Sequence, residues 1–191
     1  MKKLLFGFGV FFLISCSAQE TIGTMNSKEK ELLKEFQSIP NSATLQMTKE
    51  SEPGKKLLIC LTFVNKEGLT PLKDQKVLLY QTSNDGNYNS EVTNDERTAR
   101  IRAQGFTDEE GRLFVKTILP GSYATSGDNR HIHTQVFGAK PEAYDIHFKQ
   151  HTGARMKRFI EQRDQFFLAD LKYTTDKQLV CFVTMKVKNP K

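Results

Sequence analysis

From Lys56 onward, short apolar segments alternate with turn residues, and this pattern constrains the fold more than any other feature of the chain. Leu57–Val64 carries apolar residues on both faces of the expected strand, which is typical of a strand inside a sandwich. Further strand-like runs are Lys76–Gln81, Phe106–Ile118 (a hairpin pattern), His131–Phe137, Ala143–Phe148 and Leu179–Val187, whereas residues 166–173 fit neither period clearly. Many short strands with regular turns indicate a mainly β protein with a single β-sandwich domain.

Two segments have a helical pattern. In Asn26–Ile39, apolar residues recur at helical spacing, Asn26 is a suitable N-cap with Glu29 three residues later, and Pro40 ends the segment. We therefore expect a short N-terminal helix before the first long strand. Residues 153–165 predict a second helical segment near the C-terminus.

The N-terminal segment has the pattern of an exported, lipid-anchored protein. A basic start precedes an apolar run, Leu4–Ile14, that is too short to span a bilayer, and Ser15-Cys16 completes a sequence like a bacterial lipobox. We expect a lipoprotein signal peptide over residues 1–15, lipidation of Cys16, a polar tether over residues 16–26 and the folded domain over residues 27–191. The alternative is an ordinary secretory peptide with a chance cysteine.

This leader predicts a location at the bacterial cell envelope, either periplasmic or on the cell surface, with the lipid anchor as the contact to the membrane. Without residues 1–15 the formal charge falls from +6 to +4, because this segment contains Lys2 and Lys3 but no Asp or Glu. The remaining Lys and Arg residues are interspersed with Asp and Glu, which is typical of a solvated surface and predicts no nucleic-acid partner.

Two cysteines remain after Cys16. Cys60 and Cys181 both lie in apolar, strand-like runs. An exported location permits a disulfide between them, and two buried free thiols that pack as small hydrophobic groups are the alternative. The sequence leaves both interpretations open.

Two tyrosines and a His-x-His triplet carry the chemistry of the chain. Residues two apart on a strand point to the same face, so His131 and His133 can both reach one ion while Ile132 packs on the other side. With Tyr88 and Tyr123 they offer two phenolates and two imidazoles. Phenolate is a hard, anionic donor that suits Fe(III), whereas zinc prefers Cys, His and carboxylate. Ordinary polar histidines and turn or core tyrosines are the alternative.

The flanking motifs resemble those of the intradiol ring-cleavage dioxygenases, non-haem ferric enzymes that open catechol rings between the two hydroxyls. The resemblance is collinear over residues 55–137. It rests on Gly68–Leu72, Val77–Gln81, Gly86–Tyr88, Thr107–Arg112, Thr117–Tyr123 and His131–His133. The family fold that it implies is again a β-sandwich.

The resemblance implies that Tyr88, Tyr123, His131 and His133 bind one Fe(III). Tyr123 matches the tyrosine expected to leave the iron and accept a proton when substrate binds. The implied substrates are a small aromatic diol and O2, and the implied product is a muconate-type diacid. No oligomeric state follows from it.

The chain departs from the family pattern beside these ligands. Asp128 stands where many members carry an arginine, so Arg130 is our candidate for stabilising charge on the substrate ring. Asp145 stands near the position of a usual glutamine, and Tyr80 replaces a usual tryptophan. These differences keep a second hypothesis open, that of a catalytically inactive β-sandwich binding module at the cell envelope.

Overall fold

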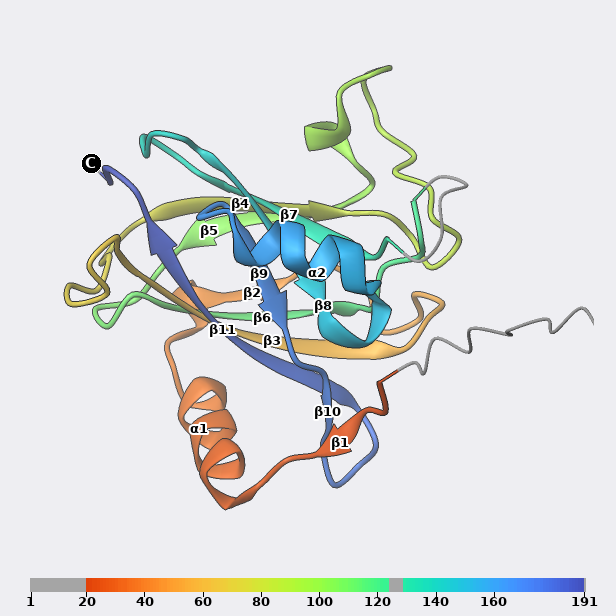
Figure 1. Cartoon of the computed structure of the whole chain (residues 1–191), viewed down its shortest axis with the longest axis horizontal. Helices are drawn as coiled ribbons and strands as arrows, with labels where there is room; N and C mark the ends of the chain where they lie inside the picture. The colour runs from red at the N-terminus through yellow and green to blue at the C-terminus, as the bar shows by residue number, and fades with distance from the viewer. Residues whose placement is uncertain (1–19, 124–128, 191) are drawn as a thin grey trace, which may run out of the picture.

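The computed structural model describes residues 20–123 and 129–190, which form two stacked β-sheets (Figure 1). The six-stranded sheet has the order β1 (Gly23–Thr24), β10 (Lys172–Tyr173), β11 (Leu179–Val187), β3 (Lys56–Asn65), β6 (Arg112–Ile118) and β2 (Thr44–Gln46). The five-stranded sheet has the order β5 (Ile101–Phe106), β4 (Lys76–Gln81), β7 (His131–Val136), β8 (Ala143–Phe148) and β9 (Phe166–Ala169). The predicted mainly β sandwich is confirmed.

The core lies between the two sheets. On β3, Leu57, Ile59, Leu61 and Phe63 are fully buried because every second side chain points inward. On β7 the buried side chains are Ile132, Thr134 and Val136, and the residues between them are partly exposed. The outer face of the five-stranded sheet therefore carries the two histidines of the triplet.

Both predicted helices are present. Helix α1 (Ser27–Gln37) begins with the predicted capping box, in which Asn26 Oδ1 accepts from the Glu29 amide at 2.9 Å and Glu29 Oε2 accepts from the Asn26 amide at 2.8 Å. It ends two residues earlier than the predicted segment and packs Leu33 and Phe36 into the core. Helix α2 (Ala154–Glu161) lies beside β9 (Figure 1). Across residues 20–123 and 129–190, no helix has the length and apolar character that a membrane span requires.

The predicted hairpin over Phe106–Ile118 is wrong. Strand β5 pairs with β4, whereas β6 pairs with β3 and β2 in the other sheet. The turn at Gly111 therefore passes from one sheet to the other. Asp108 stabilises this turn by accepting hydrogen bonds from the backbone amides of Glu110 at 3.0 Å and Arg112 at 2.7 Å. A turn signal in the sequence does not say which sheet the next strand will join.

The folded region begins earlier than the expected boundary between tether and domain. Gly23–Thr24 pairs in parallel with Lys172–Tyr173, and the Met25 side chain is buried. Glu20 forms an ion pair with Lys157 at 2.6 Å. Polar composition predicted a tether over residues 16–26, but backbone pairing in a two-residue strand needs no apolar pattern. Residues 1–15 and Cys16 lie outside the described residues.

Cys60 and Cys181 are buried free thiols, so the open disulfide prediction is not realised. The two strands that carry them, β3 and β11, are parallel neighbours, and Cys181 stands opposite Ile59. Cys60 is the residue after Ile59 on β3, and successive side chains of a strand point to opposite faces of the sheet. The two thiols therefore face opposite sides of the sheet.

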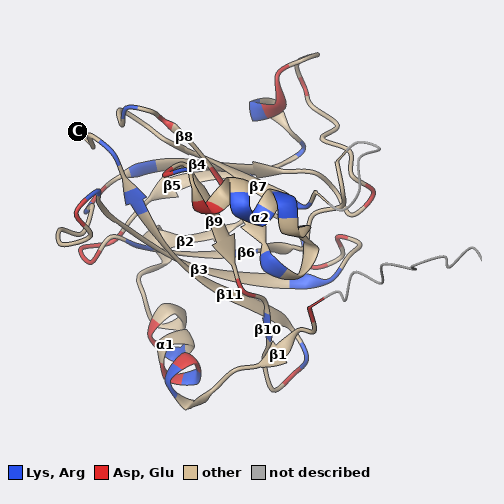
Figure 2. Ribbon diagram, viewed as in Figure 1, with Lys and Arg blue, Asp and Glu red and all other residues tan. Residues whose placement is uncertain are grey.

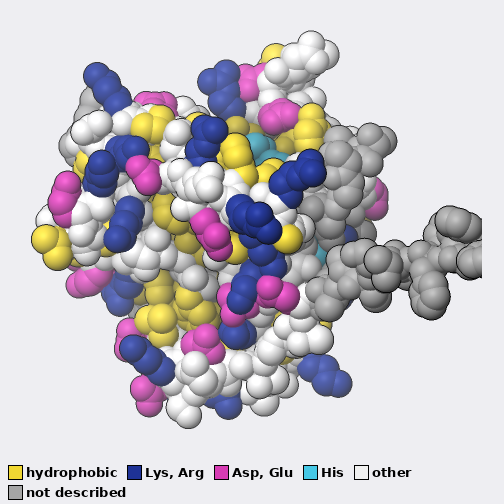
Figure 3. Space-filling view, in the orientation of Figure 1, with side chains coloured by type: hydrophobic (Ala, Val, Ile, Leu, Met, Phe, Trp, Pro, Cys, Tyr) yellow, Lys and Arg dark blue, Asp and Glu magenta, His cyan; other side chains and the backbone are white. Residues whose placement is uncertain are grey.

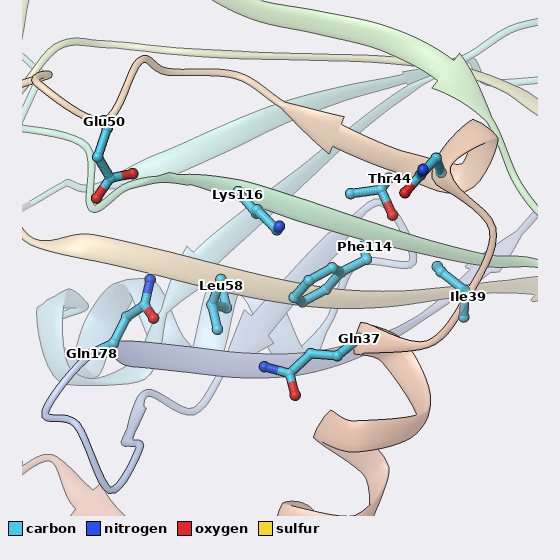
Figure 4. A pocket seen from close by; sticks show the side chains of 9 residues that line it. Gln37, Ile39, Thr44, Glu50, Leu58, Phe114, Lys116 and Gln178 are labelled. Carbon is cyan, nitrogen blue, oxygen red and sulfur yellow. The ribbon is translucent and has the colours of Figure 1, made fainter.

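The outer face of the six-stranded sheet carries a cavity of about 380 Å³ beside the end of α1 (Figure 4). The figure shows Leu58 from β3, Phe114 and Lys116 from β6, and Gln37 from α1 around it. Acidic and basic residues are interspersed along the ribbon in Figure 2, as the sequence predicted.

Candidate metal centre

The four predicted ligands come together beside the outer face of the five-stranded sheet. Tyr88 Oη lies 2.8 Å from Nε2 of His133, and that nitrogen lies 3.1 Å from Nε2 of His131. The rings of Tyr88 and Tyr123 have centroids 5.5 Å apart. Tyr88 and Tyr123 stand in loops that follow β4 and β6, and the histidines stand on β7. Three separate segments of the chain thus meet at one place.

The hydrogen bonds of the two histidines determine which ring nitrogen faces the centre. Nδ1 of His131 lies 3.0 Å from the backbone oxygen of Asn129, and Nδ1 of His133 lies 2.7 Å from Oδ1 of Asp145. Both oxygens accept hydrogen bonds, so each Nδ1 carries the proton. In the neutral rings, each Nε2 then presents a lone pair toward the other.

Two lone pairs facing each other at 3.1 Å are a poor arrangement without a cation between them. Two donors at about 2.1 Å from one ion stand about 3 Å apart when they bind at right angles, so the observed spacing fits a shared metal ion. Within the described ranges, no group of three or more His, Cys, Asp or Glu side chains is placed to hold a metal. The site therefore depends on its tyrosines, and phenolate oxygens favour a ferric ion.

The buried histidines favour the neutral form that metal binding requires. Burial lowers the pKa of His131, and the neighbouring His133 lowers it further. Burial also lowers the pKa of His147 to about 4, with a further contribution from His131. The His147 ring stacks on His131 with centroids 5.1 Å apart, because the two residues are opposite each other on β8 and β7. His147 thus packs beside His131 and restricts the orientation of its ring.

The phenols need a cation in order to ionise. Burial raises the pKa of Tyr88 far above its usual range, and the negative charge of Glu96 adds to the effect. Burial, with Asp145 and Glu96, raises the pKa of Tyr80 to about 12. A bound trivalent ion would lower the pKa of Tyr88 again, because it would stabilise the phenolate as a ligand.

Two glycines allow the tyrosine loops to approach each other closely. Gly86 has φ +81°, and a Cβ at that position would collide with the backbone oxygen of Ser122. A Cβ on Gly121 would collide with the amide nitrogen of Gly86. The loops are joined where the Gly121 amide donates to the Ser83 oxygen at 2.8 Å. These contacts explain why glycine precedes each tyrosine by two residues.

The structure adds three side chains to the predicted set. Asp145 is the hydrogen-bond partner of His133; alternation along β8 places it on the outer face, and the register of β7 and β8 sets it opposite His133. Tyr80, opposite His133 on β4, stacks on that ring with centroids 4.7 Å apart. Glu96 Oε2 lies 3.7 Å from Nε2 of His133. Nothing in the sequence signals Glu96, because it reaches the site from an irregular loop.

Arg130 lies next to the loop of Tyr123. Its Nη1 donates to the backbone oxygen of Pro120 at 3.3 Å, three residues before Tyr123. Its predicted role toward a substrate stays a prediction. Asp128, which stands at the position of the family arginine, lies outside the described residues.

A cavity of about 570 Å³ opens beside the centre. Its walls are Tyr80, Asn94, Asp95, Glu96 and Arg97. Figure 3 shows histidine surface in the upper part of this face, among hydrophobic and charged side chains. None of the four predicted ligands lines this cavity, which adjoins the centre through Tyr80 and Glu96.

The fold is shared with solved dioxygenases. The dioxygenase domain of a dioxygenase carbohydrate-binding protein fusion from Streptomyces sp. SirexAA-E matches with a TM-score of 0.55 and 16% identity, over 78% of this chain and 92% of that one. An intradiol ring-cleavage dioxygenase from Tetranychus urticae matches with a TM-score of 0.54 and 16% identity, over 76% and 86%. Catechol 1,2-dioxygenase from Pseudomonas arvilla C-1 matches with a TM-score of 0.57 and 16% identity, over 77% of this chain and 56% of that enzyme.

A comparison with curated proteins found no match. At these identities the solved structures establish the fold alone. The family described as "Dioxygenase" matches residues 34–191, which is most of the chain. The chain therefore belongs to the intradiol ring-cleavage dioxygenase family, as its motifs predicted. At the level of the family, this connects the chain with oxidoreductases that cleave catechol-type rings with O2.

Proposed function

We propose that this protein binds one Fe(III) through Tyr88, Tyr123, His131 and His133 and cleaves a catechol-type ring between its hydroxyls with O2, to give a muconate-type diacid. The observation that carries the proposal is that Nε2 of His133 lies 2.8 Å from Oη of Tyr88 and 3.1 Å from Nε2 of His131. Membership of the family supports the reaction class, and the side chains of this chain supply a complete donor set.

When bound, the ferric ion supplies Lewis acidity and a template on which both hydroxyl oxygens of the diol can be held. Hydrogen bonds to Asn129 and Asp145 orient the two imidazoles so that their Nε2 lone pairs face the centre. The stacked ring of Tyr80 restricts the orientation of His133. Tyr88 is half-buried against these rings and is suited to remain an iron ligand when substrate binds.

Tyr123 is suited to the changing role. The residue is 41% exposed and stands in the loop that follows β6. It can therefore turn outward without disrupting the core and take a proton from a substrate hydroxyl onto its own oxygen. Arg130 is our candidate for stabilising negative charge on the ring, and its contact with the Pro120 oxygen places its guanidinium beside the loop that carries Tyr123.

We further propose that the mature protein is tethered at the bacterial cell envelope through lipidated Cys16. The apolar run Leu4–Ile14 and the lipobox-like sequence support this location. Labelling cells with a radioactive or clickable fatty acid tests it. A wild-type protein that takes up label and a Cys16→Ala variant that does not are expected, whereas label on both would contradict lipidation at this residue.

The iron site is tested by the visible spectrum and iron content of the purified protein lacking residues 1–16. We expect about one iron per chain and a tyrosinate-to-Fe(III) charge-transfer band, followed by oxygen uptake with catechols. Tyr88→Phe and His133→Ala should lose iron and colour, whereas the control Tyr173→Phe, in the other sheet, should keep both. A wild-type protein that stays colourless after reconstitution with iron would favour the inactive binding module instead.

A further inference from the structure

The loop between β4 and β5 brings a carboxylate to the candidate metal centre. Glu96 begins the short 3₁₀ turn Glu96–Thr98, and its Oε2 lies 3.7 Å from Nε2 of His133. That nitrogen is the lone-pair atom of the ring, since Nδ1 is engaged with Asp145. The carboxylate thus approaches His133 on the side where a metal ion would bind.

Hydrogen bonds hold this loop in place. Asp95 caps the turn by accepting from the Arg97 amide at 3.1 Å, and Thr98 Oγ1 accepts from the Val92 amide at 2.9 Å. The Arg100 amide donates to the backbone oxygen of Tyr88 at 2.9 Å. Tyr88 and Glu96 are therefore carried by one loop whose two ends are tied together.

The nearby basic side chains are engaged elsewhere. Arg97 donates two hydrogen bonds to Asp95, each at 2.9 Å, and Arg102 pairs with Glu91 at 2.8 Å. In the part of the chain that the structure describes, no Lys or Arg side chain forms an ion pair with Glu96. A carboxylate beside two phenols and two imidazoles concentrates negative charge where a cation is needed.

Distance and charge both fit a shared ion. Donors at about 2.1 Å from one metal stand about 3 Å apart at right angles and about 4.2 Å apart when opposite, and the 3.7 Å between Glu96 and His133 lies within this range. Two phenolates and one carboxylate carry three negative charges, which balance a trivalent ion. Carboxylate oxygen is also a hard donor that suits Fe(III).

We propose that the Glu96 side chain turns toward the centre when iron binds and becomes a third anionic ligand of the ferric ion, because in the described structure His131, His133 and Glu96 form no group that could hold a metal by themselves. This inference rests on the proposed iron site. Glu96 also lines the cavity of about 570 Å³ that opens to solvent, and its side chain is 42% exposed. It therefore adjoins both His133 and this cavity, and as a ligand it would compete with an anion that enters from the cavity.

The test compares the purified wild-type protein with Glu96→Gln, which keeps the size of the side chain and removes its charge. The Fe(III) dissociation constant is measured by competition with nitrilotriacetate, and azide binding to the ferric protein is followed in the visible spectrum. We expect iron to bind about tenfold more weakly in the variant, which corresponds to about 1.4 kcal/mol, and azide to bind more tightly because an anionic competitor is gone.

Glu91→Gln is the matched control, because Glu91 lies in the same loop but pairs with Arg102 and does not line the cavity. Its iron and azide affinities should equal those of the wild type. If the wild type is coloured and Glu96→Gln has the same two affinities, Glu96 is not a ligand and the proposed function stands. If the wild type binds no iron, the proposed function itself is overturned.

Discussion

Nδ1 of His133 donates a hydrogen bond to Oδ1 of Asp145 at 2.7 Å across the neighbouring strands β7 and β8. Burial alone would raise the pKa of Asp145, but the hydrogen bond and charge of His133 lower this pKa overall. The carboxylate therefore stays ionised, keeps the proton on Nδ1 and turns Nε2 toward Tyr88. Such a carboxylate is a frequent partner of metal-binding histidines.

The first prediction concerns this pair. Asp145→Asn keeps the shape of the side chain but removes the charge that orients His133, and we expect Fe(III) affinity to fall about 10- to 100-fold. Competition with a chelator measures the affinity. Asp164→Asn serves as the control, since Asp164 is exposed and pairs with Lys188. Equal affinity of both variants would show that the charge of Asp145 is not needed to orient His133.

The second prediction concerns the contact between the tyrosine loops. In Gly121→Ala the added Cβ meets the backbone of Gly86 and Asn84, which cannot move aside as a flexible side chain would. We expect the loops to separate, the iron content to fall and the free energy of unfolding to drop by about 1–3 kcal/mol.

Gly153→Ala is the matched control for Gly121→Ala, because a Cβ there has no neighbour within 4 Å and the backbone φ is −66°. Iron content and the free energy of unfolding in urea are measured for both variants, and both quantities should fall in Gly121→Ala alone. Unchanged iron content in Gly121→Ala would mean that the close approach of the loops does not position Tyr88 and Tyr123.

The third prediction is a pH dependence of the metal-free protein. Burial lowers the pKa of His147 from 6.5 to about 4, so the folded state keeps this ring neutral while the unfolded state takes up a proton. Stability is therefore lost as pH falls from about 6.5 to about 4, by about 3 kcal/mol from this residue, and no further loss comes from it below that range.

Urea unfolding at several pH values between 7 and 4 measures this effect. His147→Gln should flatten the dependence, while His151→Gln, outside the centre, should leave it unchanged. An equally steep loss of stability in His147→Gln would assign the acid sensitivity to other groups.

The sequence predicted what depends on local pattern. Alternation on β7 placed both histidines on one face, and the Asn26–Glu29 capping box marked the start of α1. Sheet membership was not predictable in the same way. The turn at Gly111 has the residues of a hairpin, yet β5 and β6 pair in different sheets because their partners come from distant parts of the chain.

The same limit applies to the site. Its four predicted ligands have motif positions, whereas Asp145 becomes a partner of His133 only through the register of β7 and β8. Glu96 reaches the centre through an irregular loop whose course depends on hydrogen bonds such as that between Arg100 and Tyr88. Long-range register and loop course are set by tertiary contacts, which a single sequence does not display.

The last prediction concerns the two buried cysteines. Because Cys60 and Cys181 point to opposite faces of their sheet, no disulfide can form without moving a strand. Burial raises the pKa of both thiols, that of Cys181 to about 12, so the reactive thiolate is scarce in the folded protein.

We therefore expect the protein lacking residues 1–16 to resist iodoacetamide when folded and to take up two labels when unfolded without reductant, as read by mass spectrometry. Its unfolding midpoint should be the same with and without dithiothreitol, because reductant has no bond to break. A midpoint that falls with dithiothreitol, or an unfolded protein that takes up no label until reduced, would show that the two strands shift to join their thiols. The separation of the cysteines by strand register would then be wrong.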